Sequence, residues 1–161
     1  MSQTTAVVDY RALVSRADLC YQQLELEPED GLPVGNGRMG SLVWTTPSAL
    51  KLQINRVDVY PVASTTHSFV QRDTDYGLGC GFVDVDFVAG KDVFGSEHTR
   101  QHLSVYDALA TVSGPGVEAR TLAWVEKDVM AVEVDDRREQ PAAININLRM
   151  LRPPEFRTNS H

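Results

Sequence analysis

The sequence predicts an all-β fold, an antiparallel β-sandwich with at most one short helix near the N-terminus. From Met39 onward, apolar residues recur mostly with a period of two rather than 3.6. Turn signals such as Pro47-Ser48 and Gly114-Pro115-Gly116 separate these short runs. Closely spaced short strands with few helical patterns are typical of a β-sandwich.

The first thirty residues contain the one helical pattern of the chain. A helix is predicted over Asp9–Gln23, with the Asp9 side chain as its N-cap. Its apolar spacing is weak, and Asp18–Tyr21 is equally compatible with the start of a strand. The acidic segment Glu25–Gly31 contains Pro28 and is predicted to be a loop.

Seven strands are predicted after this region. They are Met39–Thr45, Ala49–Asn55, Phe82–Val88, Thr99–Ser113, Val117–Glu126, Val129–Asp135 and Ala142–Met150. The runs on both sides of Gly114-Pro115-Gly116 are expected to form an antiparallel hairpin. In the last strand Ile144, Ile146 and Leu148 share one face, which predicts a half-buried strand.

Two segments lack a strand pattern, the long loop 60–81 and the tail 152–161. Loops of this length are usually functional or disordered. The run Gly77-Leu-Gly-Cys-Gly81 resembles a phosphate loop only superficially, because no helix follows it. A β-bulge or the entry to a strand is the favoured interpretation.

Length and charge limit the classes of protein. With 161 residues, the chain is predicted to be one domain, residues 1–161. The net charge of −7 and the scattered basic residues argue against a nucleic-acid partner. No apolar run approaches the roughly 20 residues of a membrane span, and the N-terminus does not have the pattern of a secretory signal. A cytoplasmic location is therefore expected, in which Cys20 and Cys80 are reduced.

The most informative stretch is Gly31–Trp44, in which four glycines fall within ten residues. Such spacing predicts positive φ at several positions and a tight loop before a buried strand. This loop carries the amide of Asn36 and the guanidinium of Arg38, which suggests a functional site or a domain contact. The alternative is a structural hairpin turn in which Arg38 pairs with a nearby carboxylate.

Other groups with possible chemistry have simpler interpretations. His98 and His102 on one strand would lie about 13 Å apart, too far to share a metal. Asp84 and Asp86 share a strand face at glycosidase spacing, but a solvated outer face is the favoured interpretation. Five aromatic residues lie within alternating strands, where core packing is their usual role. They are Trp44, Trp124, Phe82, Phe87 and Tyr106.

The glycine-rich stretch also carries a family resemblance. It is similar to the N-terminal region of the bacterial α-L-fucosidase-like glycosidases, glycoside hydrolase family 95, and their uncharacterised relatives. The segments that resemble this family are, in order, Gly31–Trp44, Leu50–Asp58, Gln101–Val112, Gly116–Trp124 and Asp128–Val134. After Asp58 the chain reads Val-Tyr-Pro-Val instead of the family's Thr-Leu-Trp-Ser, which favours an uncharacterised relative over a strict fucosidase.

The resemblance implies a non-catalytic N-terminal β-domain of a carbohydrate-active enzyme. In that family the domain continues further and precedes an (α/α)6 barrel that performs an inverting hydrolysis, so this chain is expected to end within or at the edge of the domain. The relatives are often exported. No catalytic residue, metal or cofactor is expected here. Asn36, Arg38, Asn55 and Asp58 are the candidates for a sugar-pocket rim or a domain interface. The alternatives are a stand-alone carbohydrate-binding sandwich and a structural domain without a ligand.

Overall fold

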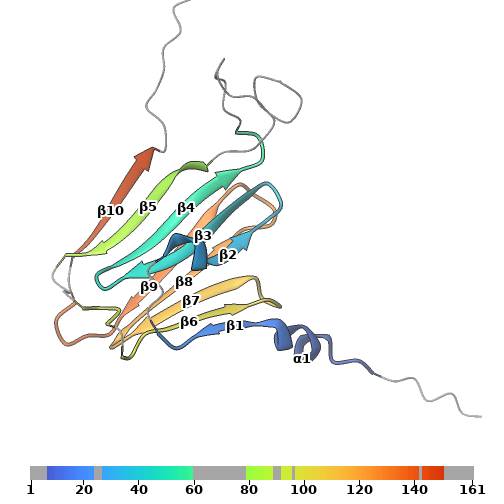
Figure 1. Cartoon of the computed structure of the whole chain (residues 1–161), viewed down its shortest axis with the longest axis horizontal. Coiled ribbons are helices and arrows are strands. Elements are labelled where there is room, and N and C mark those ends of the chain that lie inside the picture. The colour runs from blue at the N-terminus through green and yellow to red at the C-terminus, as the bar shows by residue number, and fades with distance from the viewer. Residues whose placement is uncertain are drawn as a thin grey trace, which may run out of the picture.

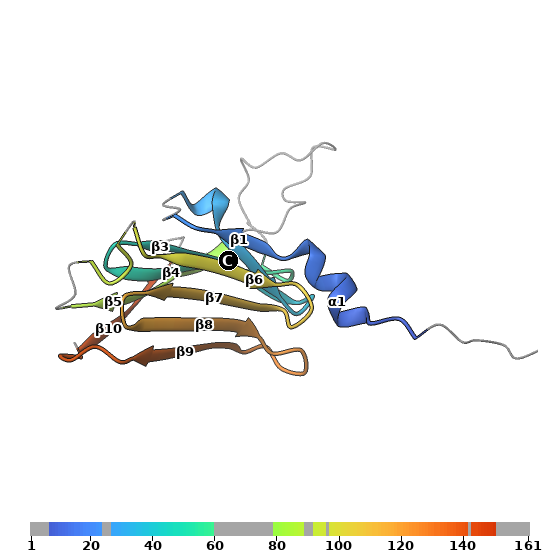
Figure 2. The same ribbon diagram turned by 90° about the horizontal axis from the view of Figure 1, so that it is seen from below.

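The protein is an all-β sandwich of two antiparallel sheets, each with five strands among the residues that the structure describes (Figures 1 and 2). The computed structural model describes residues 7–23, 27–59, 79–88, 92–95, 97–141 and 143–150. The predicted fold class is confirmed. Residues 60–78 of the long loop and the whole tail lie outside the described residues.

Each sheet combines four consecutive strands with one strand that is distant in the sequence. Sheet A has the order β1-β6-β7-β8-β9 and sheet B the order β10-β5-β4-β3-β2. The strands of sheet A are β1 Leu19–Tyr21, β6 Arg100–Ser104, β7 Leu109–Gly114, β8 Val117–Ala123 and β9 Met130–Asp136. Those of sheet B are β2 Leu32–Gly35, β3 Met39–Thr46, β4 Ala49–Arg56, β5 Gly79–Phe87 and β10 Ile144–Met150.

The N-terminal helix is shorter than predicted. Helix α1 spans Tyr10–Val14, and a 3-10 turn η1 follows at Ser15–Ala17. Asp9 caps the helix as expected, because its Oδ1 accepts from the Ala12 amide at 3.0 Å. No residue of α1 is buried, so packing does not extend it. The alternative, a strand that starts near Asp18, agrees better with the structure, because β1 begins at Leu19 and pairs with β6. A second 3-10 turn, η2 Pro28–Asp30, precedes β2.

Most of the predicted strands are present, with one clear error. The single strand predicted over Thr99–Ser113 is instead the hairpin of β6 and β7. A turn at residues 105–108 separates them, and in it Ala108 takes a positive φ of 52°. The hairpin of β7 and β8 around Gly114-Pro115-Gly116 is confirmed. The short strand β2 was not predicted.

The core lies between the sheets, where strand β2 faces β6, β7 and β8. It consists of inward side chains of both sheets and of two residues, Val93 and Phe94, from the connection between β5 and β6. Its buried members are Leu32, Val34, Val43, Leu50, Leu52, Val85, Phe87, Val93, Phe94, Leu103, Ala110, Val112, Val117 and Ala119. Phe87 and Phe94 meet edge to face at 5.6 Å, a favourable geometry for aromatic rings.

Strand β10 departs from this pattern. Its pairing with β5 sets Ile146 opposite Val85 and Leu148 opposite Val83, so its apolar residues point to the inner side of the sheet. These side chains are nevertheless exposed, Ile146 to 68% and Leu148 to 78%. The prediction of a half-buried strand was wrong, because the alternation was present but nothing in the described structure covers the apolar face.

Cys20 is exposed and Cys80 is partly buried, and both are free thiols. No helix in the described part of the chain is long and apolar enough to cross a membrane.

Candidate functional site

The glycine-rich stretch forms the hairpin between β2 and β3. Gly35 pairs with Gly40, and the Asn36 amide donates to the Met39 carbonyl at 3.0 Å, which leaves Gly37 and Arg38 as a two-residue loop. Gly37 has φ of +88°, a backbone conformation that glycine adopts readily. Within this stretch it is the one residue with positive φ, so the expectation of several such positions was wrong.

Asn36 connects this turn to the opposite sheet. Its Oδ1 accepts from the Arg38 and Met39 amides at 3.0 and 2.9 Å, which closes the turn locally. Its Nδ2 donates to the main-chain carbonyls of Trp124 at 2.8 Å and Lys127 at 3.1 Å. These carbonyls belong to the turn between β8 and β9. One side chain therefore fixes a sheet B hairpin against a sheet A hairpin.

Two arginines, Arg38 in this turn and Arg56 beside it, share Asp128 as an acidic partner. Arg56 holds Asp58 through two contacts, Nε–Oδ1 at 2.9 Å and Nη2–Oδ2 at 2.8 Å. Asp128 lies 3.3 Å from Arg56 Nη1 and 3.5 Å from Arg38 Nη2. The hydrogen bonds from Arg56 lower the pKa of Asp58 to about 2. The two positive and two negative charges balance.

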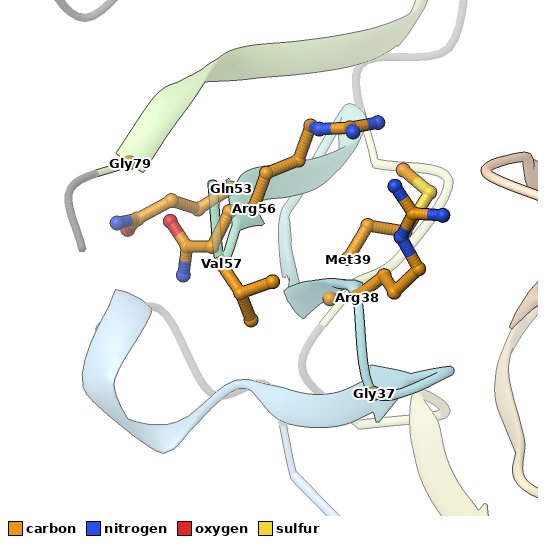
Figure 3. Close-up of a pocket in the computed structure, with 9 residues that line it drawn as sticks. Gly37, Arg38, Met39, Gln53, Arg56, Val57 and Gly79 are labelled. Atoms are coloured by element: carbon orange, nitrogen blue, oxygen red, sulfur yellow. The ribbon is translucent and has the colours of Figure 1, made fainter. Parts of the chain in front are cut away.

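A pocket of about 590 Å³ opens beside this cluster, where β3 begins and β4 ends (Figure 3). Its described lining includes the polar residues Arg38, Gln53, Asn55 and Arg56 and the apolar residues Met39 and Val57. In Figure 3 the guanidinium groups of Arg38 and Arg56 lie on one side of the view, and Gln53 lies on the other, near Gly79. No carboxylate is among the described lining residues.

Asn55 brings an unsatisfied acceptor to this pocket. It lies opposite Gly40 on β3 and Gly79 on β5, and the register of β4 with β5 shifts between Ile54 and Asn55. Its Oδ1 is buried and has no hydrogen-bond partner in the described part of the chain. A buried acceptor of this kind is costly to leave unpaired.

The structure brings the four predicted residues together at one end of sheet B. Arg38 and Asn55 line the pocket, whereas Asn36 faces the β8–β9 turn and Asp58 holds Arg56. The alternative that Arg38 pairs with a carboxylate is also met, by Asp128.

Sequence reasoning missed Gln53, Arg56 and Asp128. The strand alternation places Gln53 and Asn55 on one face, so Gln53 had a detectable signal. Asp128 had none, because it is distant in sequence.

The carboxylate pair of β5 is not solvated as expected. Asp84 is 4% exposed, and its carboxylate accepts from Arg149 Nε at 2.8 Å and lies 3.3 Å from Lys51 Nζ. The Arg149 hydrogen bonds hold the pKa of Asp84 below its usual value. Asp86 contacts Asn147 and Lys51. A lowered pKa does not suit Asp84 to the role of a general acid, and its ion pairs with Lys51 and Arg149 link β5 to β4 and β10.

The remaining sequence candidates have local roles. His98 precedes β6, whereas His102 lies within it and contacts Asp18 at 3.1 Å, so the shared strand predicted for the two histidines was wrong. Among the described residues, no group of three or more His, Cys, Asp or Glu side chains is placed to hold a metal ion. Gly79 begins β5, as the strand-entry interpretation predicted. At Gly81 a Cβ would meet the Arg149 carbonyl at 2.5 Å, so this close approach requires glycine.

The prediction that the five aromatic residues pack in the core holds for some of them only. Phe87 belongs to the core between the sheets. Trp44 is buried but lies outside that core cluster, and the partly buried Phe82 meets it edge to face at 6.3 Å. Trp124 and Tyr106 are each 47% exposed, because both lie in turns rather than in strands. Lys127 covers part of the Trp124 ring at 5.3 Å from its centroid.

No protein-family model matches this chain, and no curated protein matches it.

Proposed function

We propose that the chain is the non-catalytic β-sandwich domain of a glycoside hydrolase-like protein, and that its pocket supplies a polar rim for a carbohydrate. The observation that carries this is the lining of the pocket, in which amides and guanidinium groups stand beside apolar side chains. The amides donate to and accept from hydroxyls, and the guanidinium groups donate to them, without supplying a general acid.

The charge balance favours a neutral sugar over an anion. Asp58 and Asp128 offset Arg56 and Arg38, so a ligand meets directional hydrogen bonds rather than net positive charge. Hydrolysis in the parent protein would belong to the helical (α/α)6 partner domain that the family resemblance implies, with inversion at the sugar. This sandwich would pack against that domain.

A stand-alone carbohydrate-binding sandwich is the second candidate. The half-exposed Trp124 favours it, because its main chain is bonded to Asn36 in the turn beside the pocket. An exposed indole is a common platform for sugar rings.

Titration of the purified chain with neutral oligosaccharides, including fucosylated ones, followed by NMR chemical-shift changes, tests the binding role. Asn55→Ala and Gln53→Ala are expected to weaken binding at least fivefold, while Asn145→Ala on β10 leaves it unchanged. Trp124→Ala separates the two candidates, since it weakens binding only if the indole stacks on the sugar. If the chain binds none of the glycans, the remaining candidate is a structural domain without a ligand.

Assays on aryl α-L-fucosides and a panel of aryl glycosides test the non-catalytic role. No turnover is expected. Turnover abolished by Asp84→Asn or Asp86→Asn would instead place the active site in this domain.

A further inference from the structure

We infer that strand β10 is a self-association edge, through which two copies of this chain join their B sheets into one continuous antiparallel sheet. Figure 1 shows β10 as the outermost strand of sheet B. Within the described residues it pairs with β5 alone. This inference is independent of the proposed carbohydrate pocket, which lies where β3 begins and β4 ends.

One side of β10 has no strand partner among the residues that the structure describes. The Val88 amide donates to the Ala143 carbonyl at 3.1 Å, and these two residues stand opposite each other in the extended register of β5 and β10. Main-chain groups alternate in direction along an antiparallel strand, so the odd-numbered residues of β10 turn theirs toward β5. Those of Ile144, Ile146 and Leu148 therefore point to the open edge.

The strand also lacks the features that usually protect an edge. It is seven residues long, and it contains no proline and one charged residue, Arg149. That arginine is directed to the outer face, where it binds Asp84 and stacks over Phe82 at 4.7 Å. The inner face carries Ile144, Ile146, Leu148 and Met150, which are 39%, 68%, 78% and 79% exposed.

The sequence of β10 is complementary to itself in antiparallel orientation. A two-fold axis at Asn147 uses all seven residues and sets Ile146 against Leu148 and Ile144 against Met150 of the second copy. On the outer face, Asn145 meets Arg149, so the two arginines do not face each other. Each apolar pair occurs twice, and each buries flanks that are open in a single copy.

The register makes a sharp prediction for crosslinking, in a chain whose Cys20 and Cys80 are replaced by serine. At the two-fold axis, residue 147 lies about 4.5 Å from its own copy between Cα atoms, within reach of a disulfide. Asn147→Cys is expected to form a disulfide-linked dimer under mild oxidation. Asn145→Cys is the matched control on the same face, and its two copies would lie about 13 Å apart. Equal crosslinking of both variants, or of neither, overturns the register.

Light scattering with size-exclusion chromatography tests the association itself. The unmodified chain is expected to show a concentration-dependent dimer. Leu148→Lys should raise its dissociation constant at least tenfold, with an unchanged circular dichroism spectrum. Val125→Lys is the matched control, since Val125 is 79% exposed in the β8–β9 turn and should leave the dimer intact. A monomer at every soluble concentration, open-ended aggregates, or a dimer insensitive to Leu148→Lys would overturn the inference.

Discussion

The Asn36 side-chain amide donates to the Trp124 carbonyl at 2.8 Å and thereby joins the two sheets of the sandwich through a single polar side chain. The same side chain closes its own turn through the Arg38 and Met39 amides. One residue thus serves both the local hairpin and the contact between the sheets. These two roles can be separated by substitution.

Asn36→Ala is expected to lower the free energy of unfolding by about 1–3 kcal/mol, because it removes both sets of hydrogen bonds. Asn36→Asp keeps the acceptor for the turn but sets a carboxylate oxygen against the Trp124 and Lys127 carbonyls. The stability that this variant loses is therefore an upper bound on the contribution of the contact between the sheets. Urea denaturation of the three proteins gives both values. An aspartate variant as stable as the unmodified chain would show that the contact with the opposite sheet contributes nothing.

Gly37→Val is expected to destabilise the fold by more than about 1 kcal/mol, because valine disfavours the positive φ at this position. A Cβ at Gly37 would meet nothing within 4 Å, so the cost is conformational and not a clash. Gly37→Asn is the matched control, since asparagine tolerates this region better, and should lose less. Thermal melts that coincide for glycine and valine would contradict the strained turn.

Asp84 should make stability depend on pH on the acid side. Its pKa is lower in the folded state than in the unfolded chain, chiefly through the Arg149 hydrogen bonds. The stabilisation is therefore complete above the ordinary carboxyl pKa and is lost as pH falls through the lowered value.

Asp84→Asn should cost about 1–3 kcal/mol near neutral pH, because it weakens a buried charge-assisted contact. It should also flatten the acid limb of a plot of stability against pH. Parallel plots for the two proteins would exclude Asp84 as the source.

Gln101 is a buried amide without a hydrogen bond in the described structure. It is 1% exposed in β6, and both Oε1 and Nε2 lack a partner. Gln101→Leu is expected to raise the free energy of unfolding by about 1–2 kcal/mol, because the desolvation cost of the amide disappears. The exposed Gln140→Leu should change little. A loss of stability in the Gln101 variant would indicate a polar partner for that amide.

The strand pattern of this chain is largely local information, and it was predictable. Two-residue alternation located β3, β4 and β8, and the turn residues located the hairpin at Gly116. The split of the predicted strand 99–113 was missed because the polar turn at Asp107 interrupts a run that otherwise alternates.

The candidate site was predictable only in part. Arg38 lies in the turn that marks the region and Asn55 lies in a motif of the family resemblance, whereas Asp128 comes from another hairpin that is distant in the sequence. The exposure of β10 was also beyond prediction, because alternation tells which residues share a face but not whether another layer covers it. The resemblance to family 95 glycosidases stays a prediction.

The assignment of β1 to sheet A and β10 to sheet B has a consequence for how the molecule forms. Strand β1 of sheet A comes before every strand of sheet B in the sequence, and strand β10 of sheet B comes after every strand of sheet A. Neither sheet is therefore encoded by a continuous piece of chain. During synthesis on the ribosome, sheet B stays one strand short until Met150 has emerged, although the hairpins β6–β9 can form earlier. Strand β1 pairs with β6 and β10 pairs with β5 across dozens of residues. Pairing across such long separations is slow compared with hairpin closure, so both edge strands are expected to join their sheets after the hairpins have formed.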